Sequence, residues 1–224
     1  MTDPQAEAKR RAAIEAAGRV ESGTIVGLGT GSTAALVVEE IARRLRAGEI
    51  ARILGIPTSV ATQRLAEGLG IPLSTLDEHP VVDLTIDGAD EVDPDGQLIK
   101  GLGGALLREK MVATASRRMV IVVDASKLVD RLGTRAPLPV EVVTFAVGAH
   151  AAAIRALGAE PALRRTPGGQ PYRTDEGHVI LDCRFANGIA DPHAVQAALR
   201  SRPGVVETGL FLDLRPDVIV GRVP

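Results

Sequence analysis

The sequence predicts an α/β fold joined to a smaller α+β domain, and three observations support this prediction. Short apolar strands alternate with amphipathic helices up to about residue 131, which is typical of a parallel sheet with helices on its faces. Beyond that point the expected order of elements becomes β-α-β-β-α-β, which fits a small α+β sandwich. Near its end the chain holds one more apolar strand, in DLRPDVIVGR, that could return to the first sheet.

The first half of the chain shows the alternation clearly. We expect a helix over about 4–20, a strand at 24–28 and a helix through TAALVVEEIARRL, where apolar residues recur at helical spacing. The elements expected next are a strand at RILGIPT, a helix at VATQRLAEGL, a short strand at IPLS, a strong strand at 81–89, a turn at DPDG, a helix over about 104–118 and a buried strand at MVIVVD.

The second half has a different texture. The elements expected there are LPVEVV, an Ala-rich helix near 149–157, a strand at EPALRR, a hairpin in YRTDEGHVILDCRF, a helix from Asp191 and a strand in GVVETGLF. We therefore predict a Rossmann-like, mostly parallel sheet with helices on both faces, formed by 1–131 with 208–224. Residues 132–207 are predicted to form a smaller, ferredoxin-like α+β domain.

Composition narrows the class of protein. Of the 224 residues 45% are hydrophobic and 24% are charged, which is ordinary globular usage. No apolar stretch approaches the roughly 18 residues that a membrane span needs, and the amino terminus lacks the apolar core of a secretory signal. We expect a soluble, cytoplasmic protein with no membrane partner.

Charge and aromatic content argue against a nucleic-acid partner. The net charge is −2, and the chain has no Trp and one Tyr, so it lacks both a broad basic surface and the platforms on which bases stack. Cys183, the single cysteine, lies in an expected strand and is predicted to be a packed thiol. The four histidines, His79, His150, His178 and His193, show no spacing typical of a metal site.

A glycine-rich loop is the first candidate for ligand binding. In TIVGLGTGST, Gly27, Gly29 and Gly31 follow a strand, and Ser32 and Thr33 stand at an expected helix start. Such a loop presents backbone N–H groups and a helix dipole to an anion, although a plain tight turn would show the same pattern. Ser32 replaces the third glycine of a dinucleotide motif, and no Gly-Lys-Ser/Thr exists for a Walker loop.

Acidic residues gather where the strong strand of LTIDGADEVDPDG ends. Asp87 and Asp90 stand at its carboxyl end, the edge at which open α/β sheets bind ligands. We expect functional roles for these two residues. Glu91, Asp93 and Asp95 are interpreted as a solvated acidic turn, since their spacing is not that of a calcium loop.

Two further segments carry candidate residues. IKGLGGALLREK places Lys100 before a second glycine run and Glu109 inside the next helix, where Glu109 could act as a base only if it is partly buried. VVDASKLV puts Asp124 and Lys127 at the end of a third apolar strand. Only four of the 26 basic residues are lysines, so each lysine is notable in a chain that otherwise uses Arg.

Five motifs, in order, now resemble one family. GLGTGSTA, TIDGADE, IKGLGGALLREK, DASK and LPVEV closely resemble ribose-5-phosphate isomerase type A, over nearly the whole chain. The resemblance implies an aldose-ketose isomerase of the non-oxidative pentose phosphate pathway that interconverts ribose 5-phosphate and ribulose 5-phosphate without metal or cofactor. It also implies a homodimer or homotetramer, with the smaller domain serving in oligomerisation or as a lid.

The resemblance assigns roles to individual residues. Glu109 would move a proton between C2 and C1 through an enediolate, Asp87 would handle hydroxyl protons and ring opening, and Lys100 would stabilise the oxyanion. The phosphate would be held by Ser32, Thr33, Lys127 and Lys9, with Thr30 and Asp90 near the sugar. The other expected substrate contacts are Gly31, Gly88, Ala89, Gly101, Leu102 and Gly103, of which Leu102 interrupts a glycine run that is longer in relatives.

Two other classes of function compete with an isomerase. A sugar-phosphate-sensing effector domain without catalysis would carry a DNA-binding element, yet only about twenty residues precede the first strand. A relative of the CoA-transferases would use a glutamate nucleophile, but the DGADE and REK motifs argue against it.

Overall fold

The computed structural model describes residues 4–222 and divides the chain into two compact units. The first unit combines the chain up to Ala89 with Arg108–Lys127 and the segment from Leu214 onward. The second unit combines Asp90–Leu107 with Leu128–Asp213. No helix among the described residues is long and apolar enough to span a membrane.

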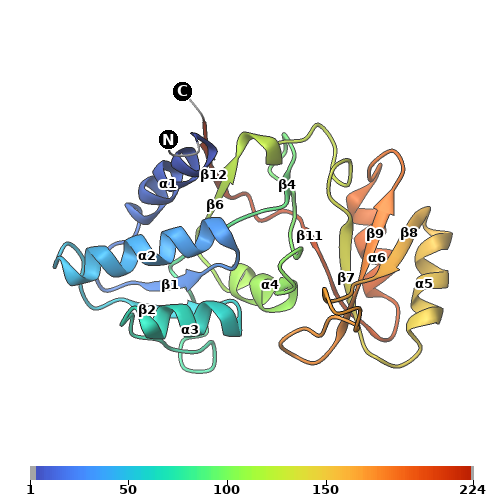
Figure 1. Cartoon of the computed structure of the whole chain (residues 1–224), viewed down its shortest axis with the longest axis horizontal. Helices are drawn as coiled ribbons and strands as arrows, with labels where there is room; N and C mark the ends of the chain where they lie inside the picture. Colours follow the sequence, from blue (N-terminus) through green and yellow to red (C-terminus); the bar gives the residue numbers. More distant parts are fainter. Residues whose placement is uncertain (1–3, 223–224) are drawn as a thin grey trace. The chain divides into compact units, whose positions relative to one another are not determined.

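A five-stranded parallel sheet is the centre of the first unit (Figure 1). Its strand order is β12-β6-β3-β1-β2. The strand near the end of the chain returns to this sheet, as predicted, and pairs there with β6. The strands are β1 (Ile25–Leu28), β2 (Leu54–Pro57), β3 (Leu84–Asp87), β6 (Met119–Asp124) and β12 (Asp217–Gly221). The helices are α1 (Pro4–Ala17), α2 (Ser32–Arg46), α3 (Val60–Gly68) and α4 (Leu106–Thr114), followed after β6 by the short 3-10 helix η1 (Ala125–Lys127).

Alternating side chains of the strands supply a core on each face of this sheet. Val26 and Leu28 of β1 pack with apolar residues of α1, α2 and α3, whereas Val112 of α4 packs with Ile56 and Val82 in a separate cluster. This two-residue period follows from the pleat of the strands. The predicted α/β architecture with helices on both faces is therefore confirmed.

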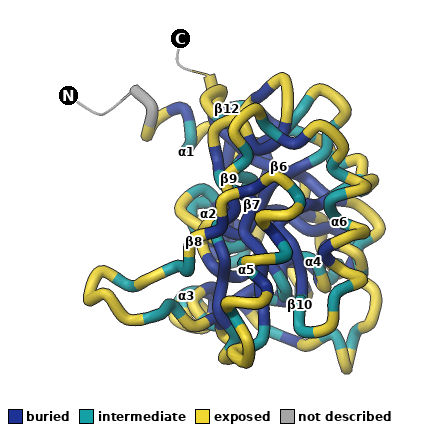
Figure 2. Tube along the Cα trace, turned by 90° about the vertical axis from the view of Figure 1, so that its right-hand side faces the viewer, coloured by how far each residue is buried: buried dark blue, intermediate teal, exposed yellow. Residues whose placement is uncertain are grey.

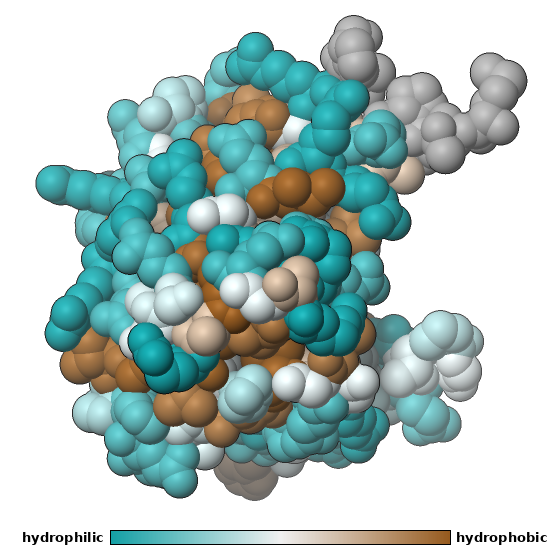
Figure 3. Space-filling view, turned by 90° about the vertical axis from the view of Figure 1, so that its left-hand side faces the viewer, coloured by the Kyte–Doolittle hydropathy of each residue, from teal (hydrophilic) through white to brown (hydrophobic). Residues whose placement is uncertain are grey.

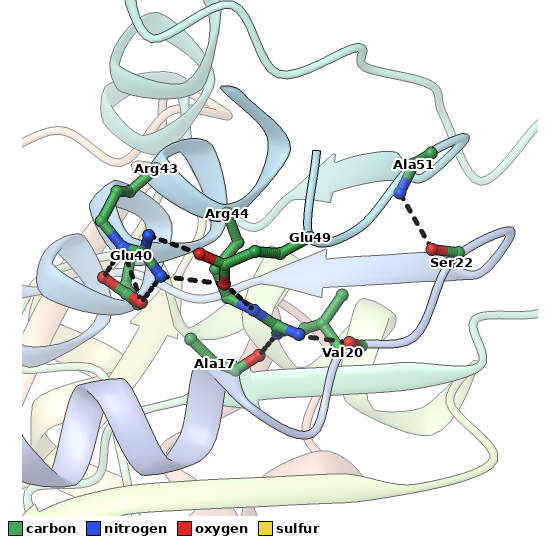
Figure 4. Close-up of polar contacts among 8 residues, drawn as sticks. All are labelled: Ala17, Val20, Ser22, Glu40, Arg43, Arg44, Glu49 and Ala51. Carbon is green, nitrogen blue, oxygen red and sulfur yellow. Dashed lines mark hydrogen bonds and ion pairs between the residues drawn. The ribbon is translucent and has the colours of Figure 1, made fainter. Parts of the chain in front are cut away.

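Polar contacts join α2 to the connections around it (Figure 4). Arg44 donates to the backbone carbonyl of Ala17, the last residue of α1, and to that of Val20, which follows α1. Arg43 donates to the carboxylates of Glu40 and Glu49. Figure 3 shows the face of the molecule that lies at the left in Figure 1. Hydrophilic side chains cover most of this face, with hydrophobic ones interspersed.

The second unit contains a four-stranded antiparallel sheet of order β10-β7-β9-β8. In chain order its elements are β-α-β-β-α-β, as predicted for a ferredoxin-like domain. They are β7 (Leu138–Val142), α5 (Val147–Ala156), β8 (Ala159–Leu163), β9 (Val179–Phe185), α6 (Pro192–Arg200) and β10 (Val205–Thr208). One apolar core joins the strands to both helices, and Figure 2 shows buried strands and largely exposed loops.

A second, three-stranded sheet in this unit was not predicted. It consists of β4 (Glu91–Val92), β5 (Leu98–Ile99) and β11 (Leu210–Phe211) in the order β11-β5-β4. The predicted domains, 1–131 with 208–224 and 132–207, place residues 90–107 in the first domain. The compact units place them in the second, together with 128–131 and 208–213.

The interpretation of Glu91 as part of a solvated turn is wrong. Glu91 is fully buried, and its carboxylate accepts hydrogen bonds from the backbone N–H groups of Gly133, Arg135 and Ala136. Ionised carboxylates satisfied by several N–H groups can be buried at tolerable cost. Only the tip of the turn matches the expectation, because Pro94 and Asp95 are exposed.

Other elements differ from expectation in length. The strand expected at IPLS is a single bridge between Gly55 and Leu73. The strand expected over 81–89 is β3 alone, and the helix expected over 104–118 is limited to α4. The strand expected in GVVETGLF is divided into β10 and β11, which pair in different sheets.

Candidate active site

The glycine loop connects β1 to α2 and leaves no room for a side chain at Gly29. A Cβ on Gly29 would lie 2.3 Å from Oδ1 of Asp87, so glycine is needed there for Asp87 to occupy its position. Gly31 has a φ of 112°, a conformation that favours glycine. Ser32 and Thr33 are the first residues of α2, where N–H groups without helical partners can meet an anion.

Asp87 ends β3 and is tied to the glycine loop. Its side chain is buried, and Oδ1 accepts hydrogen bonds from the N–H of Thr30 at 3.0 Å and of Gly88 at 2.7 Å. Ala89 follows, half-buried. The carboxyl ends of β1 and β3 thus bring together Thr30, Asp87 and Gly88, as expected of neighbouring parallel strands.

A cluster of four hydroxyl groups fixes Thr30, and sequence reasoning missed three of its members. Thr30 Oγ1 lies 2.7 Å from Thr58 Oγ1, 2.8 Å from Ser59 Oγ and 3.1 Å from Thr62 Oγ1. Thr62 Oγ1 also donates to the carbonyl of Gly29 at 2.9 Å. The available signal was the position of Thr58 and Ser59 directly after β2, at the sheet edge that binds ligands.

Glu109 is one of the buried charged residues. It lies in the first turn of α4 and is only 4% exposed, although its neighbours Arg108 and Lys110 are partly exposed. The helix dipole favours a negative charge at this end of the helix. A carboxylate largely removed from water is a stronger hydrogen-bonding and proton-accepting group than a hydrated one.

Of the expected phosphate ligands, Lys9 forms an ion pair with Asp124, and Lys127 follows Asp124 in the chain. Lys9 Nζ of α1 lies 3.5 Å from Asp124 Oδ2, and Lys127 is half-buried at the end of η1. Burial alone would raise the pKa of Asp124, but hydrogen bonds from Ser126 and the charge of Lys9 hold this pKa below its usual range. Asp124 is therefore ionised at neutral pH and positions the Lys9 ammonium.

The remaining candidates belong to the second unit. Lys100 is buried, its N–H donates to the carbonyl of Gly209 at 2.9 Å, and its Nζ lies 5.5 Å from the ring centroid of Phe211. Asp90 Oδ2 accepts from the N–H of Leu102 at 2.9 Å. Gly101 is buried with a φ of 107°, whereas Leu102 and Gly103 are exposed.

Cys183 is a packed thiol, as predicted. It is buried in β9, and this burial, followed by the charge of Asp182, raises the pKa of its thiol. His178 contacts the buried Glu141 at 3.0 Å. Across residues 4–222 there is no group of three or more His, Cys, Asp or Glu that could hold a metal ion.

Comparison with known proteins decides the family. Residues 54–223 match the family model of ribose 5-phosphate isomerase A (phosphoriboisomerase A). The chain belongs to this family. Ribose-5-phosphate isomerase A of Roseiflexus castenholzii is 55% identical over 206 residues, which cover 92% of this chain and 88% of that protein.

Solved structures of ribose-5-phosphate isomerases share the whole fold. One of a D-ribose-5-phosphate isomerase in complex with phospho-erythronic acid has a TM-score of 0.93 at 40% identity, covering 96% of this chain and 94% of its own. Ribose 5-phosphate isomerase A of Methanocaldococcus jannaschii has a TM-score of 0.91 at 40% identity, covering 97% and 95%. As a member of the ribose-5-phosphate isomerase A family, the protein is an enzyme that isomerises ribose 5-phosphate.

Proposed function

We propose that the protein interconverts D-ribose 5-phosphate and D-ribulose 5-phosphate through an enediolate, with Glu109 as the general base and acid. The observation that carries the proposal is the burial of Glu109 in the first turn of α4. An exposed carboxylate between two cations would be an ordinary surface residue, whereas a buried one can exchange protons with carbon.

The proposed reaction starts from the open-chain aldose. Glu109 removes the proton on C2, the electron pair of that bond forms the C1–C2 double bond, and the carbonyl oxygen at C1 takes the negative charge. Glu109 then returns the proton to C1 while the C2 hydroxyl loses its own proton to the oxygen on C1, which gives the ketose. Lys100 stabilises the negative oxygen in this proposal, since fixed positive charge lowers the barrier to enediolate formation.

Asp87 is proposed to move hydroxyl protons during ring opening and isomerisation. Its Oδ1 is held by Thr30 and Gly88 N–H groups, which supports a fixed orientation of the carboxylate. Thr30 and Asp90 lie near the sugar in this proposal. The other proposed substrate contacts are Gly31, Gly88, Ala89, Gly101, Leu102 and Gly103.

The phosphate of the substrate is proposed to bind at the start of α2 and beside η1. Ser32 and Thr33 supply hydroxyl and N–H donors at a helix N-terminus. Lys9 and Lys127 supply positive charge, and the ion pair of Lys9 with Asp124 supports the placing of that ammonium. No metal or cofactor takes part in the proposed chemistry.

The wider setting of the enzyme is also a proposal that rests on the family. We place it in the cytoplasm, in the non-oxidative pentose phosphate pathway, as a homodimer or homotetramer. The predicted smaller domain, 132–207, would serve in oligomerisation or as a lid.

The proposal is tested by measuring ribulose 5-phosphate formation in EDTA for the wild type, Glu109→Gln and Glu39→Gln. Glu39 is an exposed residue of α2, so its variant controls for the loss of one carboxylate. We expect the wild type and Glu39→Gln to be equally active, and Glu109→Gln to lose about 10²- to 10⁴-fold or more in kcat.

Each other outcome has a definite meaning. A wild type that binds phospho-erythronic acid but does not turn over ribose 5-phosphate would favour the sugar-phosphate-sensing alternative. A fully active Glu109→Gln would show that another group is the base. Loss of activity in EDTA that added metal restores would contradict the metal-free mechanism.

A further inference from the structure

Arg164 holds the backbone of the loop at residues 101–103. Its Nη1 donates to the carbonyl of Gly101 at 2.9 Å and to the carbonyl of Leu102 at 3.0 Å. Two successive peptide units are thus bound by one nitrogen of one side chain. No feature of the sequence around Arg164 pointed to this contact, because the loop lies more than sixty positions away in the chain.

Arg164 is itself held in place on three sides. Asp182 accepts from its Nε at 2.9 Å and also from Nη2, a two-point pairing that fixes the plane of the guanidinium. The guanidinium carbon lies 5.8 Å from the ring centroid of Tyr172. Its side chain is only 12% exposed, and its backbone N–H bonds to Ile180 while its carbonyl accepts from Tyr172, so Arg164 is a rigid support.

The hydrogen bonds determine which way the loop's N–H groups point. In a trans peptide the C=O and N–H groups point in opposite directions. With the carbonyl of Gly101 on Arg164, the N–H of Leu102 points away from Arg164 and meets Asp90 Oδ2 at 2.9 Å. With the carbonyl of Leu102 also on Arg164, the N–H of Gly103 is turned away from the guanidinium in the same manner.

Tyr172 restricts the far end of the same loop. Its hydroxyl lies 3.4 Å from the carbonyl of Gly103. A Cβ on Gly104 would lie 2.2 Å from that hydroxyl, and Gly104 has a φ of 86°. The loop therefore packs against Tyr172 so closely that only glycine fits at position 104.

We propose that Arg164, anchored by Asp182 and Tyr172, is a positioning residue that sets the peptide orientations of residues 101–103 for catalysis. The inference rests on the proposed function, which assigns this loop and Asp90 to the sugar end of the substrate. Arg164 does not touch the reacting atoms in this proposal. It acts by keeping backbone donors and Asp90 in the geometry that the enediolate requires, and such preorganisation lowers the barrier without new contacts in the transition state.

The decisive comparison is between Arg164→Met and Arg165→Met. Arg165 is the exposed neighbour whose Nη1 donates to the carbonyl of Gly169 in the same turn, so its variant controls for the loss of one positive charge at nearly the same place. Arg164→Lys keeps the charge but cannot bind two carbonyls and Asp182 together. Asp182→Asn leaves Arg164 in place with a weaker anchor. This variant tests the same positioning role if Arg164→Met does not fold.

The measurements are kcat and KM for ribose 5-phosphate, and calorimetric binding of phospho-erythronic acid and of inorganic phosphate. We expect Arg164→Met to lose about 10- to 100-fold in kcat, with weaker binding of phospho-erythronic acid and unchanged binding of inorganic phosphate. Arg164→Lys and Asp182→Asn should show the same pattern with smaller losses, and Arg165→Met should match the wild type. A role limited to folding would lower the melting temperature without separating the two ligands.

The outcomes distinguish this inference from the proposed function. If the wild type isomerises ribose 5-phosphate and a folded Arg164→Met does so equally well, the positioning role is overturned and the function stands. Equal losses for both ligands, or a loss in melting temperature alone, would also overturn it. A wild type without isomerase activity overturns the proposed function itself.

Discussion

Two buried carboxylates of one acidic segment, those of Glu91 and Asp87, have different surroundings. Glu91 accepts from three backbone N–H groups of residues 133–136, so its carboxylate holds this loop in place. Asp87 accepts from two N–H groups at the carboxyl end of its sheet, and we propose that it moves hydroxyl protons. Two residues of one acidic segment thus have different hydrogen-bond partners.

Replacement of Glu91 tests its role as a support. In Glu91→Gln an amide NH₂ takes the place of one carboxylate oxygen, so a donor faces backbone donors in a buried site. We expect the free energy of unfolding to fall by about 3 kcal/mol, since hydrogen bonds to a charged group contribute about 1.5–3 kcal/mol each. Denaturant unfolding measures this free energy, with the exposed Glu160→Gln as control. A difference between Glu91→Gln and the wild type below about 1 kcal/mol would contradict this account.

Sequence reasoning located residues whose position along an element carries the signal. Asp87 ends one apolar strand, and Ser32 and Thr33 begin the helix that follows another, so the parallel sheet predicts their shared edge. Glu91 was misread because its backbone partners lie more than forty positions away and leave no local pattern. Arg164 was missed for the same reason, and the hydroxyls of Thr58, Ser59 and Thr62 were missed because each one alone resembles an ordinary turn or cap.

Elements were predicted best where a hydrophobic run or a hydrophobic period extends over several residues. The buried runs of β1 and β6, the helical spacing of α2 and the order of elements from β7 to β10 all read directly from the chain. The two-residue strands β4, β5 and β11 are too short for any periodicity. They are strands because they pair with one another: β5 pairs with β4 across a short turn and with β11, which lies far away in the chain.

The start of α6 gives a prediction at the scale of an element. Asp191 is its N-cap, and its carboxylate accepts from the N–H of Ala194 at 2.9 Å. Removing this cap in Asp191→Ala is expected to lower the free energy of unfolding by about 1 kcal/mol, whereas Asp191→Asn should stay close to the wild type. Ser201→Ala, at the other end of α6, serves as control in the same denaturant titrations. Equal stability of the alanine and asparagine variants would show that the cap contributes nothing.

The stability of the molecule as a whole should depend on pH through His150. Burial, followed by the charge of Arg202, lowers the pKa of His150, and Arg202 Nε donates to its Nδ1 at 3.3 Å. A histidine with a lowered folded pKa binds more protons when unfolded, so its contribution to stability is complete above the unfolded pKa of about 6.5. That contribution is lost as the pH falls from there toward the folded pKa.

The check is a series of denaturant titrations at several pH values for the wild type and His150→Gln. The wild type should lose stability below about pH 6.5 more steeply than His150→Gln, which cannot gain a proton at this site. His193→Gln controls for an exposed histidine, one that lies 3.7 Å from Asp213. Parallel curves for the wild type and His150→Gln would exclude His150 as the cause.

The return of β12 to the first sheet has a consequence for synthesis on the ribosome. β6 and α1 both pack against β12, yet Leu128–Asp213, the larger segment of the second unit, is translated between β6 and β12. At about 5–20 residues per second, the ribosome needs roughly 5–20 s to add the intervening residues. During that time the newly made sheet has an unpaired edge at β6, and unpaired edges exposed during folding favour aggregation.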